Sequence, residues 1–382
     1  MKSLIRIATI LALAVAVPNS GTAAKRNMND AARDGEAGAR HAVFVQTNNP
    51  TGNAIAVYDR GSDGMLTFVG SHPTGGNGSR AIGATSDPLA SQQSLLYDRS
   101  HRLLFAVNAG SDTVSVFDVD GDQLELNQVV PSGGPFPVSV AVHGNLAYVL
   151  DAGLAGFVSG FRIEQDGVEP IDGSTRTLGL ANTNPPFFLS STAQIGFTPD
   201  GKHLLVTTKS LGMVDVFAVR QDGQLSVQPV RNPEAPLPFP FLFGSDRLLV
   251  LVNAGNSSVA TFTVGQDGAL SPAGAPVSDG QAAACWIVEA RAFQYVANTG
   301  SNDISQYRVR GDGSIELVNA TAASGIPRAT DMTTADGGRF LYVLSGSSGT
   351  VYAYSVGPNG SLTLIQTVPV PDGANIEGIA AN

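Results

Sequence analysis

The chain has 382 residues, of which 43% are hydrophobic and only 14% are charged, and its formal net charge at pH 7 is −10. No basic stripe is visible, so we expect neither nucleic acid nor an anionic membrane surface as a partner. The single cysteine, Cys285, excludes an internal disulfide and a metal site built on thiolates.

Residues 1–24 have the pattern of a secretory signal peptide. Lys2 and Arg6 give a positive start, Ile7 to Val17 is an apolar run too short to span a bilayer, and Thr22-Ala23-Ala24 supplies small residues for cleavage. A retained anchor is the alternative. The sequence therefore predicts a secreted or periplasmic protein that has no membrane contact once the signal is removed.

The rest of the chain is a flexible leader followed by one large domain. Residues 25–40 are polar, charged and free of aromatic side chains, which is typical of a flexible segment. The remaining residues, 41–382, show no sustained helical period, and 44 glycines and 22 prolines in the chain place a turn every few residues. This composition favours a single all-β domain.

A unit of three short strands is clearest in residues 247–276. Leu248 to Val252 is a continuous apolar run, as expected of a buried strand, and Val259 to Val264 alternates more loosely. Asp267-Gly268 favours a tight hairpin, because glycine tolerates positive φ. Leu270 to Ala275 then reads as a short, more polar outer strand.

The same unit occurs seven times, which is the strongest structural signal in the sequence. The copies begin at His41, Arg102, Asn145, His203, Arg247, Phe293 and Phe340. Their hairpin glycines are Gly64, Gly121, Gly167, Gly223, Gly268, Gly313 and Gly360. Repeats of this kind bury both faces of each sheet by packing against their neighbours.

A fourth, innermost strand precedes the apolar run in six copies. These strands are expected at Ser94–Tyr97, Pro137–Val142, Ala193–Phe197, Pro240–Phe243, Ala283–Val288 and Ala329–Thr333. The first copy has no such strand, and the chain end, residues 375–381, resembles one. The sequence thus predicts an all-β, seven-bladed β-propeller with four antiparallel strands per blade, whose first blade is closed by the C-terminal strand.

Propeller topology assigns the longest connections to one face. Loops from an outer strand to the next inner strand, such as 74–91 and 177–192, lie there with the turns between the second and third strands. Long loops on one rim commonly carry function, so we expect the binding site where the propeller axis opens on this face.

The histidines argue against several kinds of chemistry. His41, His101, His143 and His203 fall on the opposite face and His72 is peripheral, so a histidine-based triad or metal site is not expected. Acidic turn residues are dispersed among the blades without a calcium-ligand series. We therefore predict neither a metal nor a cofactor.

Polar residues expected near the functional face form the candidate set. They are Arg80, Asp87, Gln92, Asn108, Asp112, Asp151, Gln194, Lys209, Asn253, Cys285, Asn298, Asp303, Arg328, Asp331 and Glu377. The predicted substrate-binding residues among them are Arg80, Gln92, Asn108, Asp151, Gln194, Lys209, Asn253 and Asn298. The alternative for the four that share one repeat position (108, 151, 253 and 298) is hydrogen bonding within their own turn.

Three residues are predicted to be catalytic. Arg328 follows Pro327 at the start of an inner strand, where a guanidinium could hold a carboxylate, a lactone carbonyl or a phosphate. Glu377 would enter the axis mouth from the closing strand as a base, and Asp331 is close enough in sequence to act with Arg328. The alternative for each is a structural ion pair between blades.

The sequence resembles the lactonase family of seven-bladed propellers, which includes bacterial propeller-type phosphogluconolactonases and fungal carboxymuconate-lactonizing enzymes. The likeness rests on Asn108 to Phe117, Phe197 to Lys202 and Gly325 to Arg328. The sequence is similar in particular to exported members labelled carboxymuconate cyclase, through Ser91 to Leu95 and Cys285-Trp286. The resemblance implies the propeller fold and action on a lactone.

The sequence departs from the family motif at its acid and its histidine. The motif resembles Gly-Pro-Arg-His with a glutamate in a neighbouring turn, but here Ala329 replaces the histidine, and Ala109 and Ala254 stand where the acid would be. A lactone can be opened by a base-activated water with a cation at the developing oxyanion. Arg328 could supply that cation, with Glu377 or Asp331 as the substitute base.

Two functions remain open from the sequence. One is an exported lactonase or a carboxymuconate cycloisomerase-like enzyme that hydrolyses or forms a lactone of a small acid at the axis mouth. The other is a non-catalytic propeller that binds a small molecule, a glycan or a protein on its long-loop face. The expected partner is a small-molecule lactone or sugar-acid-like ligand, and the expected oligomeric state is a monomer.

Overall fold

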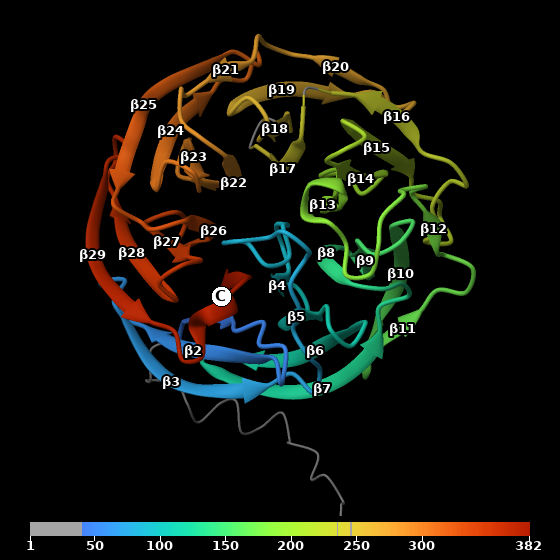
Figure 1. Ribbon diagram of the computed structural model, residues 1–382, viewed down its shortest axis with the longest axis horizontal. Coiled ribbons are helices and arrows are strands. Elements are labelled where there is room, and N and C mark those ends of the chain that lie inside the picture. Colours follow the sequence, from blue (N-terminus) through green and yellow to red (C-terminus); the bar gives the residue numbers. More distant parts are fainter. Residues whose placement is uncertain (1–39, 235, 245–246) are drawn as a thin grey trace, which may run out of the picture. The chain divides into compact units, whose positions relative to one another are not determined.

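A computed structural model describes residues 40–382, except residues 235 and 245–246 (Figure 1). The expected signal peptide and nearly all of the expected leader lie outside the described residues. The described chain forms seven small antiparallel sheets arranged around one axis (Figure 1). Its only helical elements are two short 3-10 turns, η1 (Phe188–Ser190) and η2 (Gly373–Asn375).

The first four blades use most of the first two thirds of the chain. Blade 1 contains β1 (Ala42–Gln46), β2 (Ala54–Arg60), β3 (Leu66–Pro73) and β30 (Ile379–Ala381). Blade 2 contains β4 (Leu95–Asp98), β5 (Leu103–Asn108), β6 (Thr113–Asp120) and β7 (Gln123–Pro131). Blade 3 contains β8 (Pro137–His143), β9 (Leu146–Asp151), β10 (Phe157–Glu164), β11 (Gly167–Pro170) and β12 (Arg176–Thr177). Blade 4 contains β13 (Thr192–Phe197), β14 (His203–Thr208), β15 (Met213–Ala218) and β16 (Val230–Pro233).

The last three blades follow in the same order. Blade 5 contains β17 (Pro238–Phe243), β18 (Leu249–Asn253), β19 (Ser258–Val264), β20 (Leu270–Pro272) and β21 (Val277–Ser278). Blade 6 contains β22 (Ala284–Ala290), β23 (Phe293–Asn298), β24 (Asp303–Val309) and β25 (Ile315–Ser324). Blade 7 contains β26 (Ala329–Ala335), β27 (Phe340–Ser345), β28 (Thr350–Val356) and β29 (Leu362–Pro369).

The C-terminal strand closes the ring, as the sequence predicts. Strand β30 pairs antiparallel with β1, with Phe44 opposite Ala380. The innermost strands contact one another in the circuit β30, β4, β8, β13, β17, β22, β26 and back to β30. Because the first and last strands of the described chain are joined in one sheet, both ends of the described chain are tied into the fold.

Adjacent blades are held together by apolar packing and by a repeated tyrosine contact. The second strand of each blade is almost wholly buried; every residue of β5, β14, β23 and β27 is buried. The Tyr295 hydroxyl of blade 6 donates to the hairpin carbonyl of Gly360 in blade 7 at 2.7 Å, and Tyr342 of blade 7 does the same to Gly64 of blade 1 at 2.9 Å. Gly64 has a φ of 83°, and a Cβ there would clash with the Phe340 ring. The hairpin glycines therefore fix blade contacts as well as turns.

Outer strands differ most from the sequence expectation. The predicted strand 270–275 stops at Pro272, and the edge of blade 5 resumes only at β21, after Pro276. Blade 3 is interrupted in the same way, between Pro170 and Arg176. Backbone pairing continues for one residue past Pro272 and Pro170, with Ala273 N donating to Thr261 O at 2.8 Å and Ile171 N donating to Gly160 O at 2.9 Å, before each edge is interrupted. Within the described residues, no helix has the length and apolarity needed to span a membrane.

Candidate functional site

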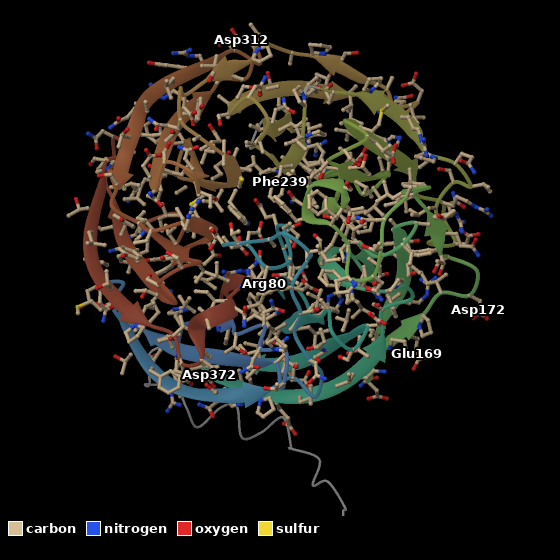
Figure 2. The ribbon with its side chains drawn as sticks, in the orientation of Figure 1. Arg80, Glu169, Asp172, Phe239, Asp312 and Asp372 are labelled. Carbon is tan, nitrogen blue, oxygen red and sulfur yellow. The ribbon has the colours of Figure 1, made fainter. Side chains whose placement is uncertain are left out.

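A pocket of about 230 Å³ lies where the axis opens on the long-loop face. We call it the mouth pocket. Its walls come from the loop between β3 and β4, from η1, from the first residues of β17 and β22, and from turns that follow β14, β18 and β23. Figure 2 places Phe239, one of its wall residues, close to the centre of the ring, whereas Asp312 lies on the circumference. The pocket is therefore where the sequence predicts a binding site.

The floor of the mouth pocket is a segment that crosses the axis before β4. We call residues 85–93 the axial plug. The Ser91 carbonyl accepts a hydrogen bond of 3.0 Å from Trp286 Nε1, the Ser91 hydroxyl donates to Val138 O at 2.8 Å, and Gln92 N donates to Ala193 O at 3.1 Å. These partners belong to blades 6, 3 and 4. The plug thus fastens distant blades to one another and closes the mouth pocket from below.

Asp87 of the plug and three ionisable side chains near it, Glu377, Lys209 and Cys285, form one electrostatic group. Burial raises the pKa of Asp87 and raises that of Glu377 well above its ordinary value, and the two carboxyl groups hydrogen-bond to each other. Two carboxyl groups can hydrogen-bond only when one is protonated. The hydrogen bond raises the pKa of Glu377 and lowers that of Asp87, so Glu377 is the proton donor of the pair and Asp87 is the acceptor.

The charge of Lys209 lowers the pKa of Asp87, against the larger effect of burial. Its ammonium donates to Ala90 O at 2.6 Å and lies 5.0 Å from the centre of the Phe239 ring. Burial lowers the pKa of Lys209 to about 8, although the Asp87 charge opposes this shift. Burial raises the pKa of the Cys285 thiol to about 12. The thiol is therefore protonated and unreactive at neutral pH.

Arg328 presents the exposed cation of the mouth pocket. Within the described part of the chain, its guanidinium forms no ion pair. Its φ is 54°, but Phe136, Leu237 and Ala283 also have positive φ just before their inner strands. The left-handed backbone at Arg328 is therefore a feature of the repeat, and the free guanidinium is the distinctive feature.

The three predicted catalytic residues do not line one cavity. Arg328 lines the mouth pocket, whereas Asp331 lines a second cavity of about 540 Å³ that follows the axis toward the short-turn face. We call the second cavity the axial channel. Glu377 is 1% exposed and lies between them, against the plug backbone at Leu89. Burial raises the pKa of Asp331 to about 8. The catalytic assignment of these residues stays a prediction.

The predicted substrate-binding residues separate into three groups: residues that line a cavity, Arg80 in the loop before the plug, and residues that share one repeat position. Lys209 lines the mouth pocket, and Gln92 and Gln194 line the axial channel. Arg80 donates to Ala84 O at 3.0 Å and to Asn375 Oδ1 at 2.6 Å, and so links the loop before the plug to η2. Figure 2 shows Arg80 near the ring centre. The third group is the set that shares one repeat position: Asn108, Asp151, Asn253 and Asn298.

This last group is buried at the ends of second strands. Asn108 donates to Ser115 Oγ at 2.8 Å and accepts from Thr74 Oγ1 at 2.7 Å. Asn298 donates in the same way to Ser305 Oγ at 2.8 Å. These contacts support the turn-stabilising alternative for Asn108 and Asn298. Within the described residues, both carboxyl oxygens of Asp151 and Oδ1 of Asn253 are buried without a hydrogen-bond partner.

Several pocket residues were not selected from the sequence. Asp87 appeared only in the wider candidate set, and the walls formed by Phe239, Trp286 and Thr299 were not identified as site residues. An available signal was the aromatic residue that follows the start of an inner strand in both β17 and β22. In residues 40–382, apart from the three undescribed positions, no three His, Cys, Asp or Glu side chains gather as a metal site would require.

Comparisons with known proteins agree with this architecture. The sequence matches a family model described as lactonase, seven-bladed β-propeller, over residues 93–285 and 266–377. No curated protein matches the sequence.

Several solved structures share the fold. One protein from Lactobacillus plantarum is 21% identical with a TM-score of 0.68, covering 89% of this chain and 99% of that one. The periplasmic gluconolactonase of Pseudomonas aeruginosa is 17% identical with a TM-score of 0.68, covering 90% and 99%. A putative 6-phosphogluconolactonase from Bacteroides uniformis is 16% identical with a TM-score of 0.67, covering 89% and 99%. On the family match, which covers most of the chain, the protein belongs to the lactonase family of seven-bladed β-propellers.

Proposed function

We propose that the protein is an exported lactone hydrolase that acts in the mouth pocket. The observation that carries the proposal is the combination of an unpaired guanidinium, Arg328, with a carboxyl group, Asp87, on the wall of one small cavity. Membership of the lactonase family supports the reaction type. Export is supported by the signal-like residues 1–24 and by the likeness to a periplasmic gluconolactonase.

The Asp87 carboxylate is suited to act as the general base. It lines the pocket, is the acceptor in its pair with Glu377, and is held by a hydrogen bond of 2.6 Å from Ala90 N to Oδ1. In the proposed step, Asp87 takes a proton from water as the water oxygen bonds to the lactone carbonyl carbon. The ring C–O bond then breaks, and the proton passes to the departing ring oxygen to give the hydroxy acid.

Arg328 and Glu377 have separate roles in this scheme. The Arg328 guanidinium receives the negative charge that develops on the carbonyl oxygen, since it is not already neutralised by an acid. Glu377 donates its proton to Asp87 in a hydrogen bond and keeps the base oriented. Asp331 lies in the axial channel and takes no part in the proposed step.

A second candidate, ligand binding without turnover, is favoured by a specific observation. Ala329 stands at the position of the histidine in the family motif. Asp87 also has a structural role, because its carboxyl group accepts a hydrogen bond from the plug backbone at Ala90. In this case Arg328 would hold the carboxylate of a small acid.

Lactone hydrolysis, measured by pH-stat titration of the purified mature chain, distinguishes the hydrolase from the binding function. Acid release above the buffer rate from at least one small lactone supports the hydrolase. No acid release from any lactone, with a sugar acid or hydroxy acid still bound at the axis mouth, would replace the hydrolase with the binding function.

A further inference from the structure

Large apolar side chains stand exposed beside the mouth pocket. Ile82 is 51% exposed, Phe187 is 41% exposed and Leu189 is 39% exposed. Two long loops hold them together: Phe188 N donates to Ile82 O at 3.1 Å, and the rings of Phe187 and Phe188 meet edge to face at 5.4 Å. We call Ile82, Phe187, Phe188 and Leu189 the apolar rim. Contiguous exposed apolar residues at a cavity edge mark a binding surface.

The apolar rim is continuous with the mouth pocket. Phe188 and Leu189 belong to both, and the pocket wall continues inward through Leu237, Phe239 and Trp286. Polar side chains also line the pocket, namely Thr85, Ser86, Asp87, Lys209, Thr299 and Arg328. Hydroxyl groups of a sugar lactone that face the apolar walls instead would lose water without gaining hydrogen bonds, which costs free energy. The same walls favour a ligand with an apolar surface.

The size of the pocket limits what it can enclose. Its volume of about 230 Å³ is below the range of about 300–1,000 Å³ that holds drug-sized ligands. A five- or six-membered lactone ring fits beside Arg328, but a longer substituent must leave the cavity. The apolar rim borders the pocket at η1 and supplies an exit surface for such a substituent.

We infer that the natural ligand is a lactone with an apolar side chain, whose ring lies in the mouth pocket and whose chain lies over the apolar rim. The identity of the ring as a lactone rests on the proposed function. The chain subsite rests separately on the exposed residues of the rim and on their continuity with the pocket.

Binding of a matched lactone series tests the inference. The series is γ-butyrolactone, γ-octalactone and γ-dodecalactone, with gluconolactone as the polyhydroxylated comparison. The fluorescence of Trp286 reports binding, because the chain has one tryptophan and its side chain borders the pocket. A fully buried methylene strengthens binding about fourfold, so a chain half covered by the rim should gain about twofold per methylene. We expect γ-dodecalactone to bind at least tenfold more tightly than γ-octalactone, and gluconolactone to bind most weakly.

The double variant Ile82→Ser, Phe187→Ser isolates the rim, because both residues belong to the rim and neither lines the mouth pocket. It should remove most of the chain-length gain while leaving γ-butyrolactone affinity unchanged. The control is Val227→Ser, at an apolar residue that is 74% exposed and lies outside the pocket. The control should keep the full dependence on chain length.

The outcomes separate the inference from the proposed function. Equal affinity across the γ-lactones, or tighter binding of gluconolactone, overturns the chain subsite, while pH-stat hydrolysis of any lactone would still support the hydrolase. Chain-dependent binding without hydrolysis keeps the subsite and removes the hydrolase. A chain-length gain that survives in the double variant also overturns the subsite.

Discussion

Gln92 pairs with the backbone of Ile287 through both atoms of its side-chain amide. Its Nε2 donates to Ile287 O at 3.1 Å, and its Oε1 accepts from Ile287 N at 3.1 Å. The amide thus substitutes for a neighbouring strand and ties the axial plug to β22. Gln194 does the same between blades, with Phe241 N donating to its Oε1 at 2.7 Å.

Gln92→Ala should destabilise the fold because it leaves two buried backbone groups of Ile287 unpaired. Each orphaned group costs about 1–3 kcal/mol, so the free energy of unfolding should fall by about 2–6 kcal/mol in urea denaturation. Gln228→Ala, at an exposed glutamine, is the control and should change stability little. Equal stability of the two variants would show that the plug does not depend on this pairing.

Deletion of residues 374–382 should lower thermal stability sharply. The deletion removes β30, exposes the edge of β1 and strips Ile376 and Ile379 from a buried cluster. Asn382→Ala, which removes only the hydrogen bonds to Ala42 N and Gly121 O, should cost far less. A truncated chain that melts at the temperature of the full chain would refute closure of the ring by the C-terminus.

Asp151 should make stability depend on pH. Burial raises its pKa to about 7, against an unfolded value of about 3.9, so between these values the folded chain binds more protons than the unfolded chain. Its contribution to stability therefore falls as pH rises from about 4 to 7, by at most about 1.4 kcal/mol per pH unit.

Asp151→Asn removes this titration. The variant should gain stability over the parent on going from pH 4.5 to pH 8, measured by urea denaturation at both values. Asp166→Asn, at an exposed aspartate, should show a constant difference from the parent. A constant difference for Asp151→Asn would mean that the buried carboxyl does not titrate in this range.

The blades could be predicted from the sequence because their signals are local. Hairpin glycines such as Gly268 and Gly313 need positive φ, and they follow buried strands by a regular distance within each unit. Closure by residues 375–381 followed from the missing inner strand of the first unit. The structure confirms it, although β30 is shorter than that range.

The site could be predicted only in outline, because its contacts join different blades. Arg328 and Asp331 are neighbours in sequence, yet a strand rises about 3.3 Å per residue, so three residues separate them by about 10 Å along the axis. This rise places Arg328 in the mouth pocket and Asp331 in the axial channel. The plug is equally long-range: Trp286 and Ser91 meet across the ring, and no local pattern specifies that contact.

The role of Arg328 in lactone opening is the central claim, and kinetics of Arg328→Ala test it most directly. Loss of one oxyanion donor typically costs about 10²–10³ in kcat, so kcat/KM for the best lactone should fall by about that factor. Arg310→Ala, at an exposed arginine paired with Glu316, should retain the parent rate. Equal kcat/KM for Arg328→Ala and the parent chain would contradict the account.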